Sequence, residues 1–79
     1  MKLPRNLDAQ ALIRHLERKW SYVIVRQTGS HIRLRTTEPS LHAVTIPNHA
    51  PIKPGTLASV LKDIAAHKDV PAEEILSGL

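Results

Sequence analysis

Residues 26–34 read Arg-Gln-Thr-Gly-Ser-His-Ile-Arg-Leu, and this stretch decides the fold. Residues 21–27 and residues 31–37 are rich in Val, Ile, Tyr and Thr, which favours two strands. The glycine between them is typical of a tight turn. The sequence therefore predicts a β-hairpin with a histidine at the first position after the turn.

Two turns are compatible with this hairpin, and they differ in which side chains of the first strand face the core. A two-residue turn at residues 29–30 would set the two valines of the first strand beside the apolar residues of the second. A three-residue loop at residues 27–29, with the glycine supplying a positive φ, would set Tyr22 and Ile24 there instead. We expect the three-residue loop because it buries the bulkier pair.

The second strand separates its side chains onto two faces. Because side chains alternate along a strand, His31, Arg33 and Arg35 are expected opposite Ile32 and Leu34. Two arginines on one face with no acidic residue between them favour an anion, and the histidine beside the turn is titratable near neutral pH. This face is therefore a candidate site for a phosphate-bearing substrate.

The remaining segments predict helices and one further strand. Residues 8–19 carry apolar residues at helical spacing, with Asp8 as the N-cap. His42–Ile46 is expected to form a third strand that ends before Pro47. Pro54–Ala66 has the same helical spacing and begins with a proline, which suits a first turn. Residues 69–79 suggest a short third helix.

This order predicts an α+β fold of α-β-β-β-α type, built as two layers in a single domain of residues 1–79. Two helices would cover one face of a three-stranded antiparallel sheet, with a short C-terminal helix added. This is the topology of the double-stranded-RNA-binding domain. The expected core residues are Leu12, Leu16, Leu57, Leu61 and Ile64 from the helices, and Ile24, Ile32, Leu34, Val44 and Ile46 from the strands.

Composition limits the function classes. The chain has 79 residues, a net charge of +4 and no cysteine, so disulfides and thiolate metal sites are excluded. The excess of bases favours a polyanionic partner, while the 3% aromatic content argues against a base-stacking surface. No apolar stretch is long enough for a signal peptide or a membrane span, which predicts a cytoplasmic protein.

Other candidate residues lie outside the hairpin. Lys53, Gly55 and Thr56 stand at the start of the second helix, where free amides and the helix dipole favour phosphate. His49 is a candidate for a second acid/base group. His42 and His49 form a weak metal-ligand pair, so we expect no metal and no other cofactor.

Three motifs together resemble a known family. They are Gly29-Ser30-His31, the stretch VTIPNH at residues 44–49, and KPGTLASVLKDIA at residues 53–65. From the first helix to Ala66 the chain resembles the HicA-type toxins of bacterial toxin–antitoxin pairs. The resemblance implies a small mRNA interferase on a double-stranded-RNA-binding-like fold, silenced by a HicB-type antitoxin.

The resemblance also assigns residues. It implies that His31 is the essential histidine and that Gly29 is the glycine before it. Pro47 and His49 correspond to the proline and histidine after the third strand, and residues 55–57 correspond to the glycine-threonine-leucine that begins the second helix. One position departs from the family, which usually has glycine where this chain has Ser21.

We therefore expect a toxin that is a metal-independent endoribonuclease, with His31 as general acid or base. The expected RNA and phosphate contacts come from Gly29, Ser30, Arg33, Arg35, Lys53 and Thr56. The expected partners are mRNA and a HicB-type antitoxin that covers the His31 face. Two alternatives stay open: a non-catalytic RNA-binding module that uses the same basic face, and an adaptor whose exposed sheet pairs with a protein. His15 and His67 are expected on the helix surfaces.

Overall fold

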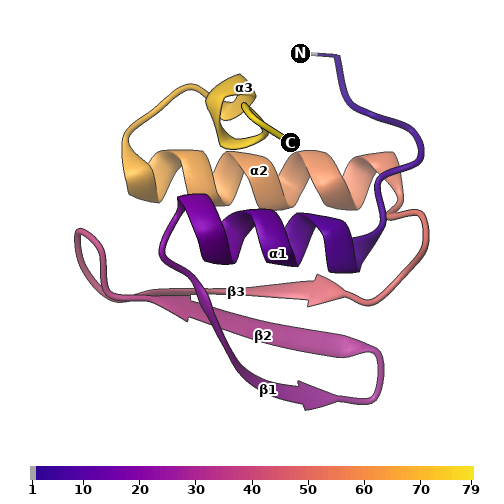
Figure 1. The fold of residues 1–79 in the computed structure, drawn as a ribbon, viewed down its shortest axis with the longest axis horizontal. Helices are drawn as coiled ribbons and strands as arrows, with labels where there is room; N and C mark the ends of the chain where they lie inside the picture. The colour runs from indigo at the N-terminus through magenta and orange to yellow at the C-terminus, as the bar shows by residue number, and fades with distance from the viewer. Residues whose placement is uncertain (1) are drawn as a thin grey trace.

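The computed structural model describes residues 2–79 of the chain. Its elements are α1 (Ala9–Lys19), β1 (Val23–Thr28), β2 (His31–Thr36), β3 (His42–Pro47), α2 (Pro54–Lys68) and α3 (Ala72–Ile75). The helices α1 and α2 lie together on one face of the antiparallel sheet β1-β2-β3, and α3 packs beside α2 (Figure 1). The predicted α+β class and element order are confirmed.

The element bounds differ slightly from the predicted ones. Asp8 is the N-cap of α1, but its side chain makes no capping hydrogen bond. The strand β1 begins at Val23, two residues later than expected. The helix α2 continues to Lys68 and ends where Asp69 adopts a left-handed conformation with φ of 58°. Local periodicity located each helix, whereas its last turn depends on packing that periodicity does not contain.

The expected three-residue loop between β1 and β2 is wrong. Thr28 pairs with His31, so the turn is the two-residue alternative at residues 29–30. A β-bulge between Ile24 and Arg26 then shifts the register, and Ile24 pairs with Leu34. A bulge adds one residue to β1, so the side chains that precede it change faces. Ile24 therefore lies opposite Leu34 even though the turn has two residues.

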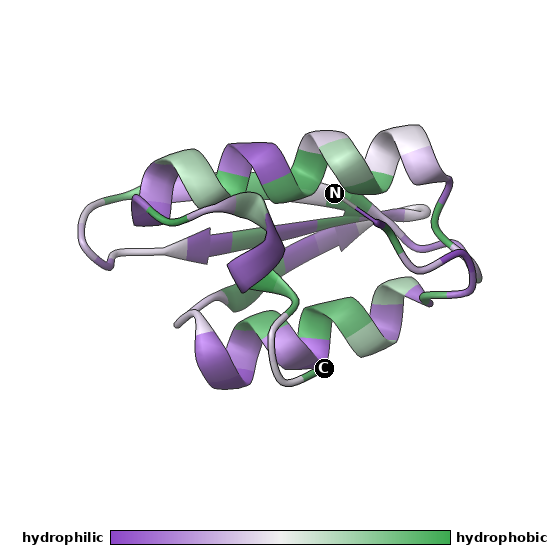
Figure 2. Cartoon of the chain, turned by 90° about the horizontal axis from the view of Figure 1, so that it is seen from above, coloured by the Kyte–Doolittle hydropathy of each residue, from purple (hydrophilic) through white to green (hydrophobic). Residues whose placement is uncertain are grey.

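Hydrophobic residues from both layers form one core, and Figure 2 shows them on the facing sides of the helices. Nine of the ten expected core residues are buried, and the exception is Ile24, which is 47% exposed because β1 extends beyond the cover of the helices. Tyr22 is fully buried as expected, although the three-residue loop from which we expected this is not formed. Buried residues outside the ten expected core residues include Leu7, Ile13, Ile52 and Val60, and Ile75 of the C-terminal segment is buried as well.

The C-terminal segment buries a histidine that we expected on the surface. His15 is only 1% exposed, and its Nε2 lies 2.7 Å from the carbonyl oxygen of Ile75 at the end of α3. Trp20 Nε1 donates to the same oxygen at 2.9 Å. The expectation for His15 is wrong because α3 folds back over α1, and this contact joins residues 60 positions apart in the chain.

Candidate functional site

The turn between β1 and β2 presents His31 to solvent. Gly29 has φ of +58°, and no atom lies within 4 Å of the position that a Cβ would take. A positive φ at the first turn residue is the type II′ requirement, which glycine meets without strain. His31 follows as the first residue of β2, and its side chain is exposed. A narrow, unobstructed turn therefore lies beside an accessible imidazole.

The outer face of the sheet, which no helix covers, carries a group of arginines. Arg33 and Arg35 are exposed while Ile32 and Leu34 are buried, as strand alternation predicts. The Nη1 of Arg33 donates to the Thr45 hydroxyl at 3.1 Å, which holds the guanidinium against β3.

Arg26 belongs to the same group, and the sequence analysis missed it. Arg26 pairs directly with Arg33 across the strands, so both side chains leave the same face. We call Arg26, Arg33 and Arg35 the arginine face. Within residues 2–79 none of the three forms an ion pair with an acidic side chain. Like charges placed opposite each other are unfavourable, and a bound anion would relieve that repulsion.

The β3–α2 loop is tied to the hairpin turn. Pro47 pairs with His31, and the next amide, of Asn48, donates to the Ser30 carbonyl at 2.6 Å. The Asn48 side chain in turn accepts from Gln10 Nε2 at 3.1 Å. These contacts fix the turn to the first residues of α1.

His49 lies in the same loop. Its side chain is exposed, and its carbonyl accepts from the Ala9 amide at 3.0 Å. Because Asn48 contacts the residue before His31, the two histidines lie at the same end of the sheet. No hydrogen bond joins their imidazoles in the described part of the chain.

Both long helices begin at this end, which we call the turn end (Figure 1). Lys53 is the exposed N-cap residue of α2, and no acidic residue lies in the first turn of either helix. Gly55 is exposed and Thr56 is half-buried. Free amides at a helix N-terminus carry partial positive charge; the Asp8 carboxylate at the N-cap of α1 offsets it there, so the start of α2 beside Lys53 is the more electropositive of the two.

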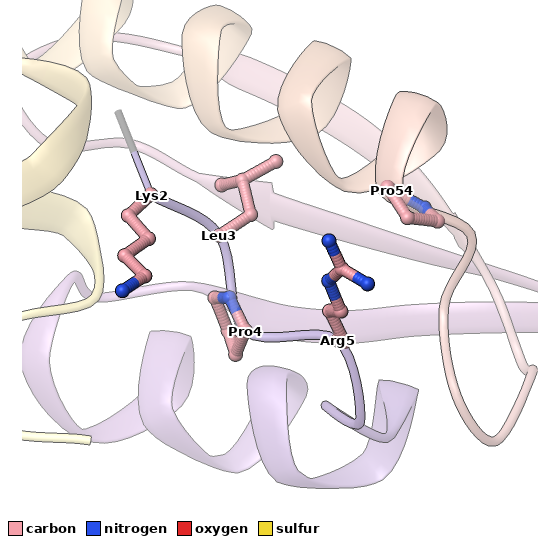
Figure 3. Close-up of a pocket in the computed structure, with 5 residues that line it drawn as sticks. All are labelled: Lys2, Leu3, Pro4, Arg5 and Pro54. Atoms are coloured by element: carbon pink, nitrogen blue, oxygen red, sulfur yellow. The ribbon is translucent and has the colours of Figure 1, made fainter.

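The N-terminal segment adds one cation, Arg5, near the start of α2 (Figure 3). An open cavity of about 430 Å³ is lined by Lys2, Leu3, Pro4, Arg5 and Pro54. Arg5 directs its guanidinium toward Pro54 (Figure 3). The structure thus brings the Arg5 guanidinium toward the start of α2, while the Lys2 side chain points away from it (Figure 3).

A second polar cluster lies at the opposite end of β3, where that strand begins. Tyr22 and His42 Nδ1 are 2.9 Å apart, and His42 Nε2 is 3.1 Å from Asp63. The His67 ring stacks on His42 with centroids 4.4 Å apart, and His67 Nε2 donates to the Ser40 carbonyl. His67 is therefore half-buried, and the expectation that it is a surface residue is wrong.

Two ionisation equilibria are shifted in this cluster. Burial, and secondarily the Asp63 charge, raise the pKa of Tyr22 to about 12. Burial lowers the pKa of Lys68, whose ammonium donates to the Thr36 hydroxyl and the Glu38 carbonyl. These contacts attach the end of α2 to the sheet and to the β2–β3 loop.

The possible metal pair of His42 and His49 is not brought together. His42 is the first residue of β3, and His49 follows the end of that strand. Six strand residues span roughly 20 Å, so the two rings cannot share one ion. Among residues 2–79 no group of three histidine, cysteine or acidic side chains has the geometry of a metal site.

Comparison with known proteins gives one match. Residues 9–65 match the family model of the HicA toxin of bacterial toxin–antitoxin systems, which is more than half of the chain. No curated protein and no solved structure matches the chain. No helix within residues 2–79 has the length and apolar character needed to cross a membrane.

Proposed function

The chain belongs to the HicA toxin family, and from that premise we propose that it is an endoribonuclease that cleaves mRNA with His31 as an acid/base catalyst. Family membership implies a toxin that acts with an antitoxin partner. The observation that carries the finer proposal is the exposed His31, placed between an open glycine turn and three unpaired arginines.

The proposed reaction uses the ribose itself as nucleophile. His31 accepts the proton of a 2′-hydroxyl, and the 2′-oxygen attacks the adjacent phosphorus. The bond from phosphorus to the 5′-oxygen breaks, and a second group gives a proton to that oxygen. The products are a 2′,3′-cyclic phosphate and a 5′-hydroxyl. Such proton transfers contribute typically about 10²- to 10⁴-fold each to the rate.

His49 is the proposed source of the second proton. It is exposed, and the Asn48 contact to Ser30 holds its loop at the turn end. In this arrangement the two imidazoles would stand on either side of the scissile phosphate. Solvent is the alternative proton donor. His49→Ala should slow cleavage if His49 is the donor and leave the rate unchanged if solvent is.

The phosphate contacts are proposed from the charges at the turn end. The Gly29 amide and the Ser30 hydroxyl would donate to the non-bridging oxygens, and Arg33 would offset the charge of the transition state. Arg35 and Arg26 would continue this path along the outer sheet face. Lys53 and Thr56 would hold a further phosphate at the start of α2. With only two aromatic residues in the chain, this surface favours phosphate contacts over base stacking.

The test compares His31→Ala with Thr28→Ala. Thr28 pairs with His31 and is also exposed, so the control changes the same part of the hairpin without removing an imidazole. We expect the His31 variant to lose at least about a hundredfold in cleavage of RNA while it keeps its fold and RNA affinity. The Thr28 variant should cleave nearly as fast as the wild-type toxin.

Two further measurements test the chemistry. A strand with one 2′-deoxyribose at the cleaved position should bind but stay intact, and the cut product should end in a cyclic phosphate. Cleavage of the deoxy position, or a His31→Ala rate equal to that of the wild type, would refute the proposal. Binding without any cleavage would instead support the alternative of a non-catalytic RNA-binding module.

The proposed antitoxin is of the HicB type and covers the His31 face. Acidic side chains on its contact surface would complement the basic charge of the toxin.

A further inference from the structure

The strand β1 is an open edge of the sheet. It pairs with β2 on one side only, and all six of its residues are exposed. In Figure 1 it is the strand farthest from the helices. A strand at the edge of a sheet presents alternate N–H and C=O groups that have no partner, and an extended segment of another chain can pair with them.

The edge is also apolar where it begins. Val23, Ile24 and Val25 are consecutive and are 53%, 47% and 42% exposed. The other large exposed hydrophobic residues of the described chain are Leu41 in a loop and Leu79 at the C-terminus, so neither adds to a strand edge. Contiguous apolar residues on an unpaired strand indicate a surface that a partner covers.

Charge decides which kind of partner fits. Arg26 continues the strand, and Val23 pairs with Arg35, so the apolar edge borders the arginine face. A second copy of this chain, itself at net charge +4, would bring two such faces together. An acidic segment would instead pair its backbone with β1 and set its carboxylates over the arginines.

The β-bulge restricts how such a segment pairs. The register of β1 shifts between Ile24 and Arg26, so an added strand cannot run along the whole edge in one uniform ladder. Bulges at an edge also discourage indiscriminate pairing of one copy with another. Both effects favour a partner whose sequence is specific for this edge.

We propose that β1 is the docking edge for an extended, acidic segment of the antitoxin, which adds to the sheet as a fourth strand. Its carboxylates would occupy the arginine face and exclude RNA phosphates from it. The docking itself rests on family membership, and the exclusion of RNA rests on the proposed function.

The first experiment measures amide hydrogen exchange of the wild-type toxin, alone and bound to its full-length cognate antitoxin. Amides of β1 that face away from β2 should exchange in the free toxin and become protected in the complex. Unchanged exchange across residues 23–28 in a saturated complex would overturn the proposal. Protection of the same amides in the free toxin, with a dimeric mass in solution, would overturn it in favour of self-pairing.

The second experiment uses Val23→Gln and Val25→Gln, with Leu41→Gln as the matched control for a neutral polar side chain on an exposed apolar position. The two strand variants should each weaken antitoxin binding by about tenfold or more, because they replace an apolar side chain by a polar amide in the desolvated centre of the contact. The Leu41 variant should bind like the wild type. Equal affinities for all three variants, each shown to be folded by circular dichroism, would refute the docking edge.

Cleavage of RNA by the free variants separates this proposal from the preceding one. Both valine variants should cleave RNA at the wild-type rate while they escape the antitoxin. A toxin that binds its antitoxin through β1 but never cleaves RNA would refute the nuclease and leave the docking edge standing. Valine variants that cleave RNA and bind the antitoxin as tightly as the wild type would refute the docking edge and leave the nuclease standing.

Discussion

Replacement of Tyr22 by phenylalanine should lower the free energy of unfolding at neutral pH and raise it at alkaline pH. Tyr22 is 1% exposed, and its hydroxyl donates to His42 Nδ1 at 2.9 Å. At neutral pH the variant loses this bond, which costs about 0.5 to 1.5 kcal/mol in the free energy of unfolding. The wild type is then the more stable protein.

At alkaline pH the variant should become the more stable protein, because only the wild type has a phenol to ionise. Burial and the Asp63 charge raise the pKa of Tyr22 from 10.0 to about 12 in the folded protein. The contribution of Tyr22 to the free energy of unfolding is therefore complete below pH 10 and is lost as pH rises toward 12. Two pKa units correspond to about 2 to 3 kcal/mol, so the two stabilities should become equal at roughly pH 10 to 11.

The assay is urea unfolding followed by the fluorescence of the single tryptophan, Trp20, from neutral pH to about pH 12 for both proteins. Lys68 ionises in the same range, but it is present in both proteins and its effect largely cancels in their difference. Since Tyr22 is the only tyrosine, its ultraviolet phenolate absorbance gives the pKa directly. Stability curves that stay parallel across this range, or a phenolate that forms with an unshifted pKa, would refute the reasoning.

Three further outcomes follow from backbone geometry and charge. Ser21 has φ of 61°, a conformation that disfavours residues with a Cβ, so Ser21→Gly should raise the free energy of unfolding by about 0.5 to 1 kcal/mol and the melting temperature by about 2 to 8 °C. Gly29→Ala has room for its Cβ but not the favoured φ, so thermal unfolding should show a loss of about 1 to 2 kcal/mol with the fold retained. A loss near zero would contradict the positive φ. Arg33→Gln should make the dependence of log affinity for RNA on log salt shallower by about 1, and an unchanged slope would remove Arg33 from the phosphate contacts.

The position of Ser21 connects the family pattern with the structure. The resemblance to HicA-type toxins implies a glycine where this chain has serine, and the left-handed φ of Ser21 is the conformation that glycine adopts without strain. The serine therefore raises the energy of the turn into β1, and the next residue, Tyr22, is buried.

Local pattern alone determined which segments are helices and strands and which face of β2 is exposed. Both signals come from neighbouring residues: helical spacing repeats every three to four positions, and strand side chains alternate. Leu12, Leu16, Ile32 and Leu34 were therefore assigned correctly to the core, and the exposed positions of His31 and Arg33 could be predicted.

Tertiary structure decided what depends on residues far apart in the chain. The bulge in β1 places Ile24 opposite Leu34, the fold-back of α3 buries His15, and the Asn48 contact brings His49 to the turn end. None of these has a periodic signature, because each depends on how separate elements pack and on which backbone groups then need a hydrogen-bond partner.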